Sequence, residues 1–82
     1  MPAGREAEIF GSTIRRLRLE RGWTQEHLAH AAGLTTTYVG QVERGAKVPS
    51  LRVVLRLARG LEVSPADMVA DFTLGVLRRL RL

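Results

Sequence analysis

Residues 24–45, TQEHLAHAAGLTTTYVGQVERG, decide the fold of this chain. They contain two short helical patterns that only Gly33 and Leu34 separate. Thr24 and Thr35 can each cap a helix N-terminus, because a threonine hydroxyl accepts a hydrogen bond from an amide of the first turn. Gly33 can adopt the positive φ that a tight connection between helices often needs. The stretch predicts helices over 24–32 and 35–45 that cross at a steep angle.

The second of these helices has one apolar face and one polar face. If Tyr38, Val39 and Val42 point inward, the residues that point outward are Thr36, Thr37, Gly40, Gln41 and Arg44. The major groove of DNA admits one helix, and its base edges are read by hydroxyl, amide and guanidinium groups. Gln25, at the start of the preceding helix, would lie over the phosphate backbone, where helix N-termini favour anions.

The rest of the chain predicts an all-α fold of five helices in a single domain, 1–82, with a core over 6–72. Helical spacing over 6–21 buries Ile9, Phe10, Thr13, Ile14 and Leu17. Ser50 caps a fourth helix whose inner stripe is predicted as Leu51, Val54, Leu55, Ala58 and Leu61. Ser64 and Pro65 begin a fifth helix with Met68, Val69 and Phe72. Gly75 counts against a helix in the tail that follows.

Composition indicates a basic helical protein. The 82 residues carry 13 Lys and Arg against 8 Asp and Glu, a net charge of +5, and Lys47 is the only lysine. A strongly basic small domain is an electrostatic hint of a nucleic-acid partner. No apolar run approaches the length of a membrane span, and the start MPAGREAEIF has no apolar signal segment. The chain contains no cysteine, so we expect a protein of the reducing cytoplasm.

Residues 12–70 resemble the helix-turn-helix domain shared by phage repressors, Cro-like proteins and many bacterial regulators. The segments that carry the resemblance are RLRLERGWTQEHLAHAAGL (16–34), YVGQVERG (38–45) and PSLRVVLRLARGLEVSPADM (49–68). Within that family, the short length and TTTYVGQVERG look most like the controller proteins of restriction–modification systems, which are dimeric autoregulators. Those proteins often carry an arginine where Thr36 stands, so their base preference is not carried over.

The resemblance implies a role for each matching residue. The residues that take positions contacting bases or nearby phosphates are Gln25, Thr36, Thr37, Tyr38 and Gln41, with Thr35 as the cap beside them. Arg44 and Lys47 take positions that commonly meet the DNA backbone. Glu43 usually supports such a domain by pairing with a base on another helix, and we expect Arg16 or Arg15 as its partner. Arg18 and Arg21 are expected on a solvated face.

A homodimer is expected, because one helix in one groove makes too few contacts for selectivity. The apolar residues available for pairing are Met68, Phe72, Leu74 and Leu77, within a C-terminal helix and tail over 65–82. An alternative is an antitoxin-like protein-interaction module that uses this apolar tail. A second alternative is a membrane-surface protein anchored by LGVLRRLRL, although this stretch is short for anchoring.

No catalytic, metal or cofactor site is predicted. Without cysteine a nucleophile would have to be serine or threonine, and the sequence has neither a glycine-rich nucleophile turn nor a phosphate loop. His27 and His30 are spaced for one metal ion but have no third ligand of suitable position, so both are expected as ordinary surface or half-buried histidines. No small-molecule ligand is expected, since this length leaves no room for a ligand-binding domain.

Overall fold

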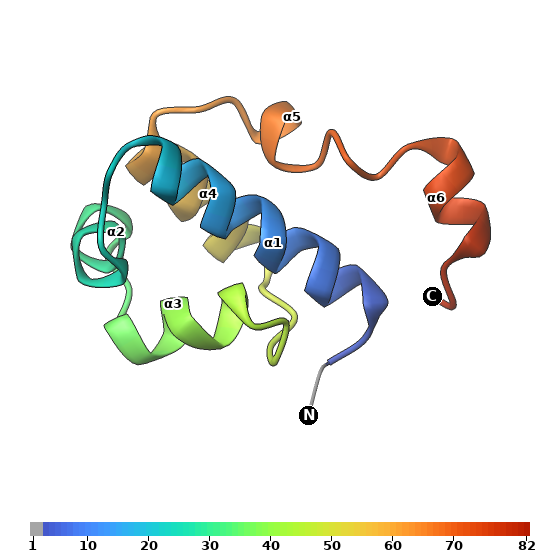
Figure 1. Cartoon of the computed structure of the whole chain (residues 1–82), viewed down its shortest axis with the longest axis horizontal. Helices are drawn as coiled ribbons and strands as arrows, with labels where there is room; N and C mark the ends of the chain where they lie inside the picture. The colour runs from blue at the N-terminus through green and yellow to red at the C-terminus, as the bar shows by residue number, and fades with distance from the viewer. Residues whose placement is uncertain (1–2) are drawn as a thin grey trace.

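The computed structural model describes residues 3–82, and within this range it contains helices and no strands. The helices are α1 Arg5–Glu20, α2 Gln25–Ala32, α3 Thr36–Glu43, α4 Leu51–Leu61, α5 Pro65–Met68 and α6 Leu74–Arg79. The first five form one body, and α6 projects from it (Figure 1). The all-α prediction is confirmed, with six helices instead of five. None of the helices in residues 3–82 is long and apolar enough to cross a bilayer.

The helix starts follow the capping residues in the sequence. Thr24, Thr35, Ser50 and Ser64 each accept a hydrogen bond from a first-turn amide, as predicted. Gly33 ends α2 at φ 69°, in the left-handed region, and this turns the chain sharply into α3. Local sequence therefore sets both ends of the α2–α3 connection.

The core lies where α1, α2, α3 and α4 meet. Its largest fully buried side chains, none more than 1% exposed, are Ile14, Leu28, Val39, Val42, Leu57, Leu61 and Met68. Two glycines let backbones approach closely. A Cβ at Gly11 of α1 would meet the carbonyl oxygen of Glu43 at 2.8 Å, and one at Gly60 of α4 would meet the backbone of α2 at 3.0 Å. Because Gly11 has no side chain, the side of α1 on which it lies can pack directly against the backbone of α3.

The predicted inner stripe of α4 is wrong at two positions. Leu51 and Leu55 are 73% and 48% exposed, whereas Leu57 is buried with Ala58 and Leu61. Val53 and Val54 pack against the edge of the core. The sequence of α4 has apolar residues at helical spacing on two sides of the helix. The side that faces the core carries Leu57 and Leu61, and the other carries Leu51 and Leu55. The outer face of α4 therefore mixes leucine with exposed arginines at 52, 56 and 59.

The predicted fifth helix is also too long. Helix α5 ends at Met68, and the next residues form a turn in which the amide of Phe72 donates to the carbonyl of Val69 at 3.0 Å. The buried Thr13 hydroxyl of α1 donates to Asp71 Oδ2 at 3.0 Å and so holds this turn against the body. Thr73 then caps α6, which Gly75 does not prevent from forming.

Candidate nucleic-acid interface

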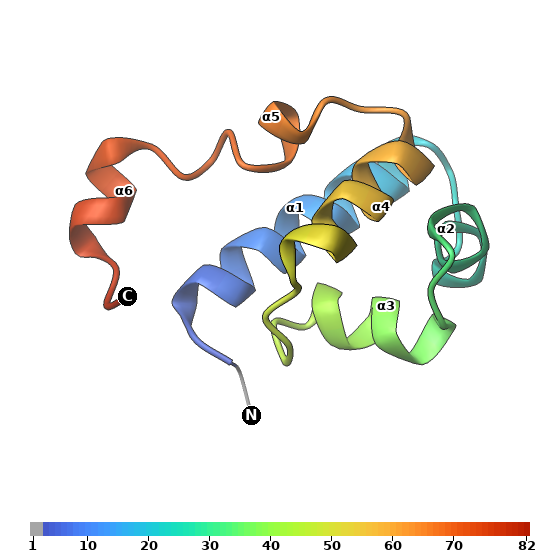
Figure 2. The ribbon, with the colours of Figure 1, turned by 180° about the vertical axis from the view of Figure 1, so that it is seen from behind.

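Helices α2 and α3 form the unit on which the predicted DNA contacts lie (Figure 2). Thr24 Oγ1 accepts from the His27 amide at 3.0 Å, and Thr35 Oγ1 accepts from the Tyr38 amide at 3.1 Å. Between the helices, the amide of Leu34 donates to the carbonyl of Ala29 at 2.8 Å. These bonds fix the angle between the two helices, so α3 stands at the edge of the body with one face toward solvent.

The outward face of α3 has the polar character that the sequence predicts. Thr36 and Thr37 are exposed, and Gln41 is half-buried. Arg44 caps the C-terminus of α3 and is exposed. Glu43, the only acid of α3, is buried. The exposed side of the helix therefore presents hydroxyl, amide and guanidinium groups and no free carboxylate.

Two of the predicted contact residues, Thr35 and Tyr38, have a second, structural task. Thr35 is exposed, but its hydroxyl is engaged as the α3 cap. The ring of Tyr38 packs against the core and leaves the residue half-buried. Lys47 lies exposed in the loop after α3. The predicted set lies along α2, α3 and the loop that follows them, and its members differ in exposure.

Gly40 does not lie on the outward face as predicted. It is buried, and a Cβ there would come within 3.5 Å of Gln25 Oε1 and 3.1 Å of an Arg44 guanidinium nitrogen. The tight contact is with the Arg44 side chain, whereas the distance to Gln25 is an ordinary van der Waals separation.

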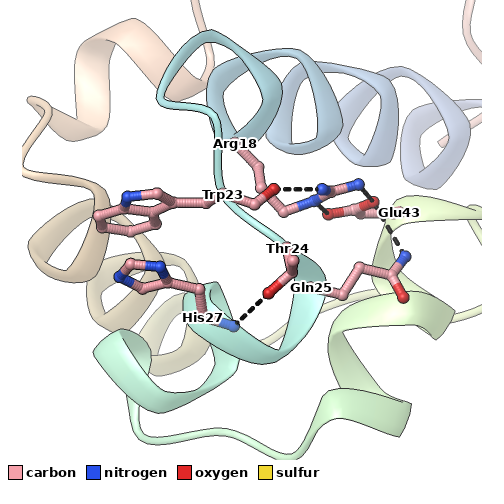
Figure 3. Close-up of polar contacts among 6 residues, drawn as sticks. All are labelled: Arg18, Trp23, Thr24, Gln25, His27 and Glu43. Carbon is pink, nitrogen blue, oxygen red and sulfur yellow. Dashed lines mark hydrogen bonds and ion pairs between the residues drawn. The ribbon is translucent and has the colours of Figure 1, made fainter.

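A buried ion pair joins α1 to α3 (Figure 3). The Arg18 guanidinium donates from Nε to Glu43 Oε2 at 2.7 Å and from Nη2 to Glu43 Oε1 at 3.0 Å. Its Nη1 donates to the carbonyl oxygen of Trp23 at 2.6 Å. The prediction of Arg15 or Arg16 as the partner of Glu43 is wrong, and so is the solvated position of Arg18, which is 8% exposed. Arg18 follows Phe10 and Ile14 at helical spacing and so lies on the same buried stripe. This spacing is the sequence feature that indicates Arg18, and not Arg15 or Arg16, as the buried partner of Glu43.

The ion pair also positions Gln25. Gln25 Nε2 donates to Glu43 Oε1 at 3.1 Å, so the side chain at the start of α2 is held against α3. Hydrogen bonds to Glu43 raise the pKa of the Arg18 guanidinium above its ordinary value, burial opposes the rise, and Coulomb attraction to Glu43 adds to it. Glu43 is thereby neutralised beside the polar face of α3, which keeps a negative charge away from a polyanionic ligand.

The tryptophan and the histidines form a separate cluster. Trp23, in the connection between α1 and α2, packs against the core and stacks on His27 with ring centroids 4.2 Å apart (Figure 3). The Arg21 guanidinium lies over the Trp23 ring, 5.0 Å from its centroid, and makes a cation–π contact with it. Among residues 3–82, no group of three or more ligating side chains could hold a metal ion.

The residues predicted to pair two copies lie at different depths. Met68 is fully buried in the core of its own chain, so its side chain is not available to a second copy, and the prediction that it pairs two copies is wrong. Phe72 is half-buried and packs against the core. Leu74 and Leu77 of α6 are 61% and 40% exposed.

Comparison with known proteins places this arrangement in a family. A family model described as a helix-turn-helix domain matches residues 9–72. The control protein C.BamHI of Bacillus amyloliquefaciens is 34% identical over 68 residues, which cover 82% of this chain and 84% of that protein. The HTH-type transcriptional regulator YazB of Bacillus subtilis is 38% identical over 63 residues, covering 77% and 91% of the two chains.

A solved structure agrees with the sequence relatives. The restriction–modification controller protein C.AhdI from Aeromonas hydrophila superposes with a TM-score of 0.75 at 41% identity, covering 77% of this chain and 96% of that one. The match includes α2 and α3 in sequence, and the geometry above gives α3 an exposed polar face. This chain belongs to the helix-turn-helix family and is a DNA-binding transcriptional regulator.

Proposed function

We propose that the protein acts as a homodimer that reads a two-fold symmetric operator, with α3 of each copy in the major groove. The observation that carries this proposal is the acid-free outward face of α3, where Thr36 and Thr37 are exposed and Gln41 is half-buried. Hydroxyl and amide groups hydrogen-bond to base edges, and a threonine methyl can contact a thymine methyl. Arg44 and Lys47, at the end of α3, would bind the flanking phosphates.

We further propose that it regulates in the manner of a controller protein, without a catalytic step of its own. The similarity to C.BamHI and C.AhdI supports this, since both are described as control or controller proteins. Because its ligand is DNA, we expect it to work in the cytoplasm, where bacterial DNA lies. Thr36 stands where controller proteins often carry arginine, so we expect its operator sequence to differ from theirs.

The spacing of the half-sites tests the dimeric part of the proposal. A two-fold dimer binds half-sites about one helical turn, roughly 10 base pairs, apart. Inserting about five base pairs at the centre of a selected operator turns one half-site to the opposite side of the duplex. We expect the affinity then to fall to that of a single half-site, measured by fluorescence anisotropy. An unchanged affinity would mean that the copies bind independently.

The protein-interaction alternative draws on one observation, the exposed leucines of α6. An antitoxin-like module would use this helix to bind a second, different protein. The family model ends at residue 72, before α6, so the DNA-reading proposal does not depend on what α6 binds.

A further inference from the structure

The glycine in the middle of α3 is not explained by the packing of the fold. Gly40 lies in regular helix and its φ is not positive, and a glycine at such a position destabilises a helix relative to alanine. Gly11 and Gly60 each face the backbone of a neighbouring helix. Outside its own helix backbone, the atoms nearest to the place of a Gly40 Cβ belong instead to the side chains of Arg44 and Gln25.

The Arg44 side chain covers Gly40. Arg44 follows one turn later, and its amide donates to the Gly40 carbonyl at 3.1 Å. Side chains on a helix lean toward its N-terminus, so Arg44 extends back over the preceding turn. Its Nη1 lies 3.1 Å from the place of the missing Cβ, which is tighter than most contacts of a real Cβ. Gly40 is therefore buried although Arg44 itself is exposed.

Gln25 of α2 lies on the other side of the same space, which we call the Gly40 notch. Gln25 Nε2 donates to Glu43 Oε1 at 3.1 Å (Figure 3). A carboxylate only accepts hydrogen bonds, so the amide nitrogen has to face Glu43. The amide oxygen is then the nearer atom to the notch, at 3.5 Å from the place of the Cβ against 3.8 Å for the nitrogen. A guanidinium only donates, so this oxygen is a favourable neighbour for Arg44.

We propose that Gly40 is a positioning residue for DNA binding: the notch left by its missing side chain holds the Arg44 guanidinium beside Gln25 and orients it toward a phosphate. This inference rests on the proposed phosphate contact of Arg44 and adds the residue that sets its geometry. A guanidinium binds phosphate best through two parallel N–H groups, so its orientation determines the strength of the contact. A side chain that is already ordered on α3 also loses less rotamer freedom when DNA binds.

Alanine at position 40 separates positioning from damage to the fold. Alanine favours the helix and restricts the unfolded chain, so Gly40→Ala should leave the stability unchanged or raise it. The group that has to move is the end of a long, exposed arginine side chain, and it can move without disturbing the core. DNA affinity should fall at the same time, because the guanidinium is displaced from the notch. A purely structural glycine would lose stability and affinity together.

A double-mutant cycle on the full chain tests the notch. The wild type is compared with Gly40→Ala, Arg44→Ala and the variant that carries both changes. The matched control is Gly40→Ala in the Arg44→Ala background, where the notch has no guanidinium to hold. Fluorescence anisotropy gives the affinity for the selected operator and for a random duplex of the same length at several salt concentrations. Urea unfolding followed by circular dichroism gives the stability of each protein.

We expect Gly40→Ala to weaken binding to both DNAs by roughly threefold to tenfold for each copy bound, a part of what one charge-assisted hydrogen bond contributes. The slope of log affinity against log salt should fall by up to about one for each half-site. The urea midpoint should stay the same or rise. In the Arg44→Ala background, the same substitution should change the affinity by less than about twofold, because the two changes act on one contact.

Wild-type affinity in Gly40→Ala, or a lower urea midpoint, would overturn the positioning role. An equal loss of affinity in the Arg44→Ala background would also overturn it, since residue 40 would then act on the DNA without Arg44. If Arg44→Ala itself binds both DNAs like the wild type, the phosphate contact in the proposed function is wrong, and the notch has no contact to position. The Arg44→Ala titration therefore distinguishes failure of the proposed function from failure of the notch alone.

Discussion

Replacing Glu43 by alanine is expected to lower the free energy of unfolding by about 3–5 kcal/mol. The substitution leaves the Arg18 guanidinium, 8% exposed, with the Trp23 carbonyl as its remaining partner among the described residues. A buried charge without its counter-ion carries an uncompensated desolvation cost. Gln25 loses its acceptor at the same time. Because a small domain has only about 5–15 kcal/mol of stability, the variant should be close to unfolding at room temperature.

Urea unfolding followed by circular dichroism and by fluorescence of the single tryptophan measures this loss. The matched control is Glu20→Ala, which removes the exposed Arg16–Glu20 pair at 3.4 Å, with side chains 52% and 60% exposed. We expect that change to stay within about 0.5 kcal/mol. Arg18→Met combined with Glu43→Leu should recover much of the loss, since no unpaired charge is then left inside. Equal small effects from Glu43→Ala and Glu20→Ala would refute a structural role for the buried pair.

Thr37→Ala is expected to weaken binding to the selected operator by roughly 2–6 kcal/mol, because one lost base contact costs about 1–3 kcal/mol and a dimer carries the change at both half-sites. Thr37 is exposed, and the α3 cap is the hydroxyl of Thr35. The substitution should therefore leave the unfolding transition unchanged. Binding to random DNA should also be nearly unchanged, since non-specific affinity comes from phosphate contacts.

Arg44→Ala provides the contrast. A phosphate contact has no sequence preference, so its loss should weaken operator and random DNA alike and reduce the slope of log affinity against log salt by about one per half-site. Titrations of both variants on both DNAs, at several salt concentrations, separate the two roles. Identical losses from Thr37→Ala and Arg44→Ala on the two DNAs would argue against the division into base-reading and backbone-binding residues.

The elements near the functional face could be predicted from sequence because their signals are local. Thr24 caps the start of α2, Gly33 ends α2 with a positive φ, and Thr35 caps the start of α3; the structure has each of these features. Capping depends on a residue and an amide two or three positions away. Such a pattern is complete within a few residues and does not depend on the rest of the fold.

The errors arose where distant residues decide the outcome. The turn after α5 is held by Asp71 bonding to Thr13 of α1, a contact between residues 58 positions apart. Helix α4 faces the core along Leu57 and Leu61 because α2 packs closely on Gly60. Helical periodicity offers more than one apolar stripe when leucines occur on two sides, and only packing selects between them.

Arg18 illustrates a different difficulty. A charged side chain is expected outside unless it is paired, and the sequence of α1 contains several arginines that could pair with Glu43. Position along the buried stripe distinguishes Arg18 from Arg15 and Arg16, which are exposed. Charge pattern alone does not. The assignment of a buried ion pair therefore needs the helix orientation as well as the residue types.

Selection from a random-sequence DNA pool at ~150 mM salt, followed by sequencing of the retained molecules, tests the central claim most directly. At this ionic strength the purely electrostatic share of binding is strongly reduced, so retention depends on contacts made by α3. We expect a two-fold symmetric motif whose half-sites lie about one helical turn apart. Retention without a sequence motif, or no retention, would contradict a dimer that reads DNA through the exposed face of α3.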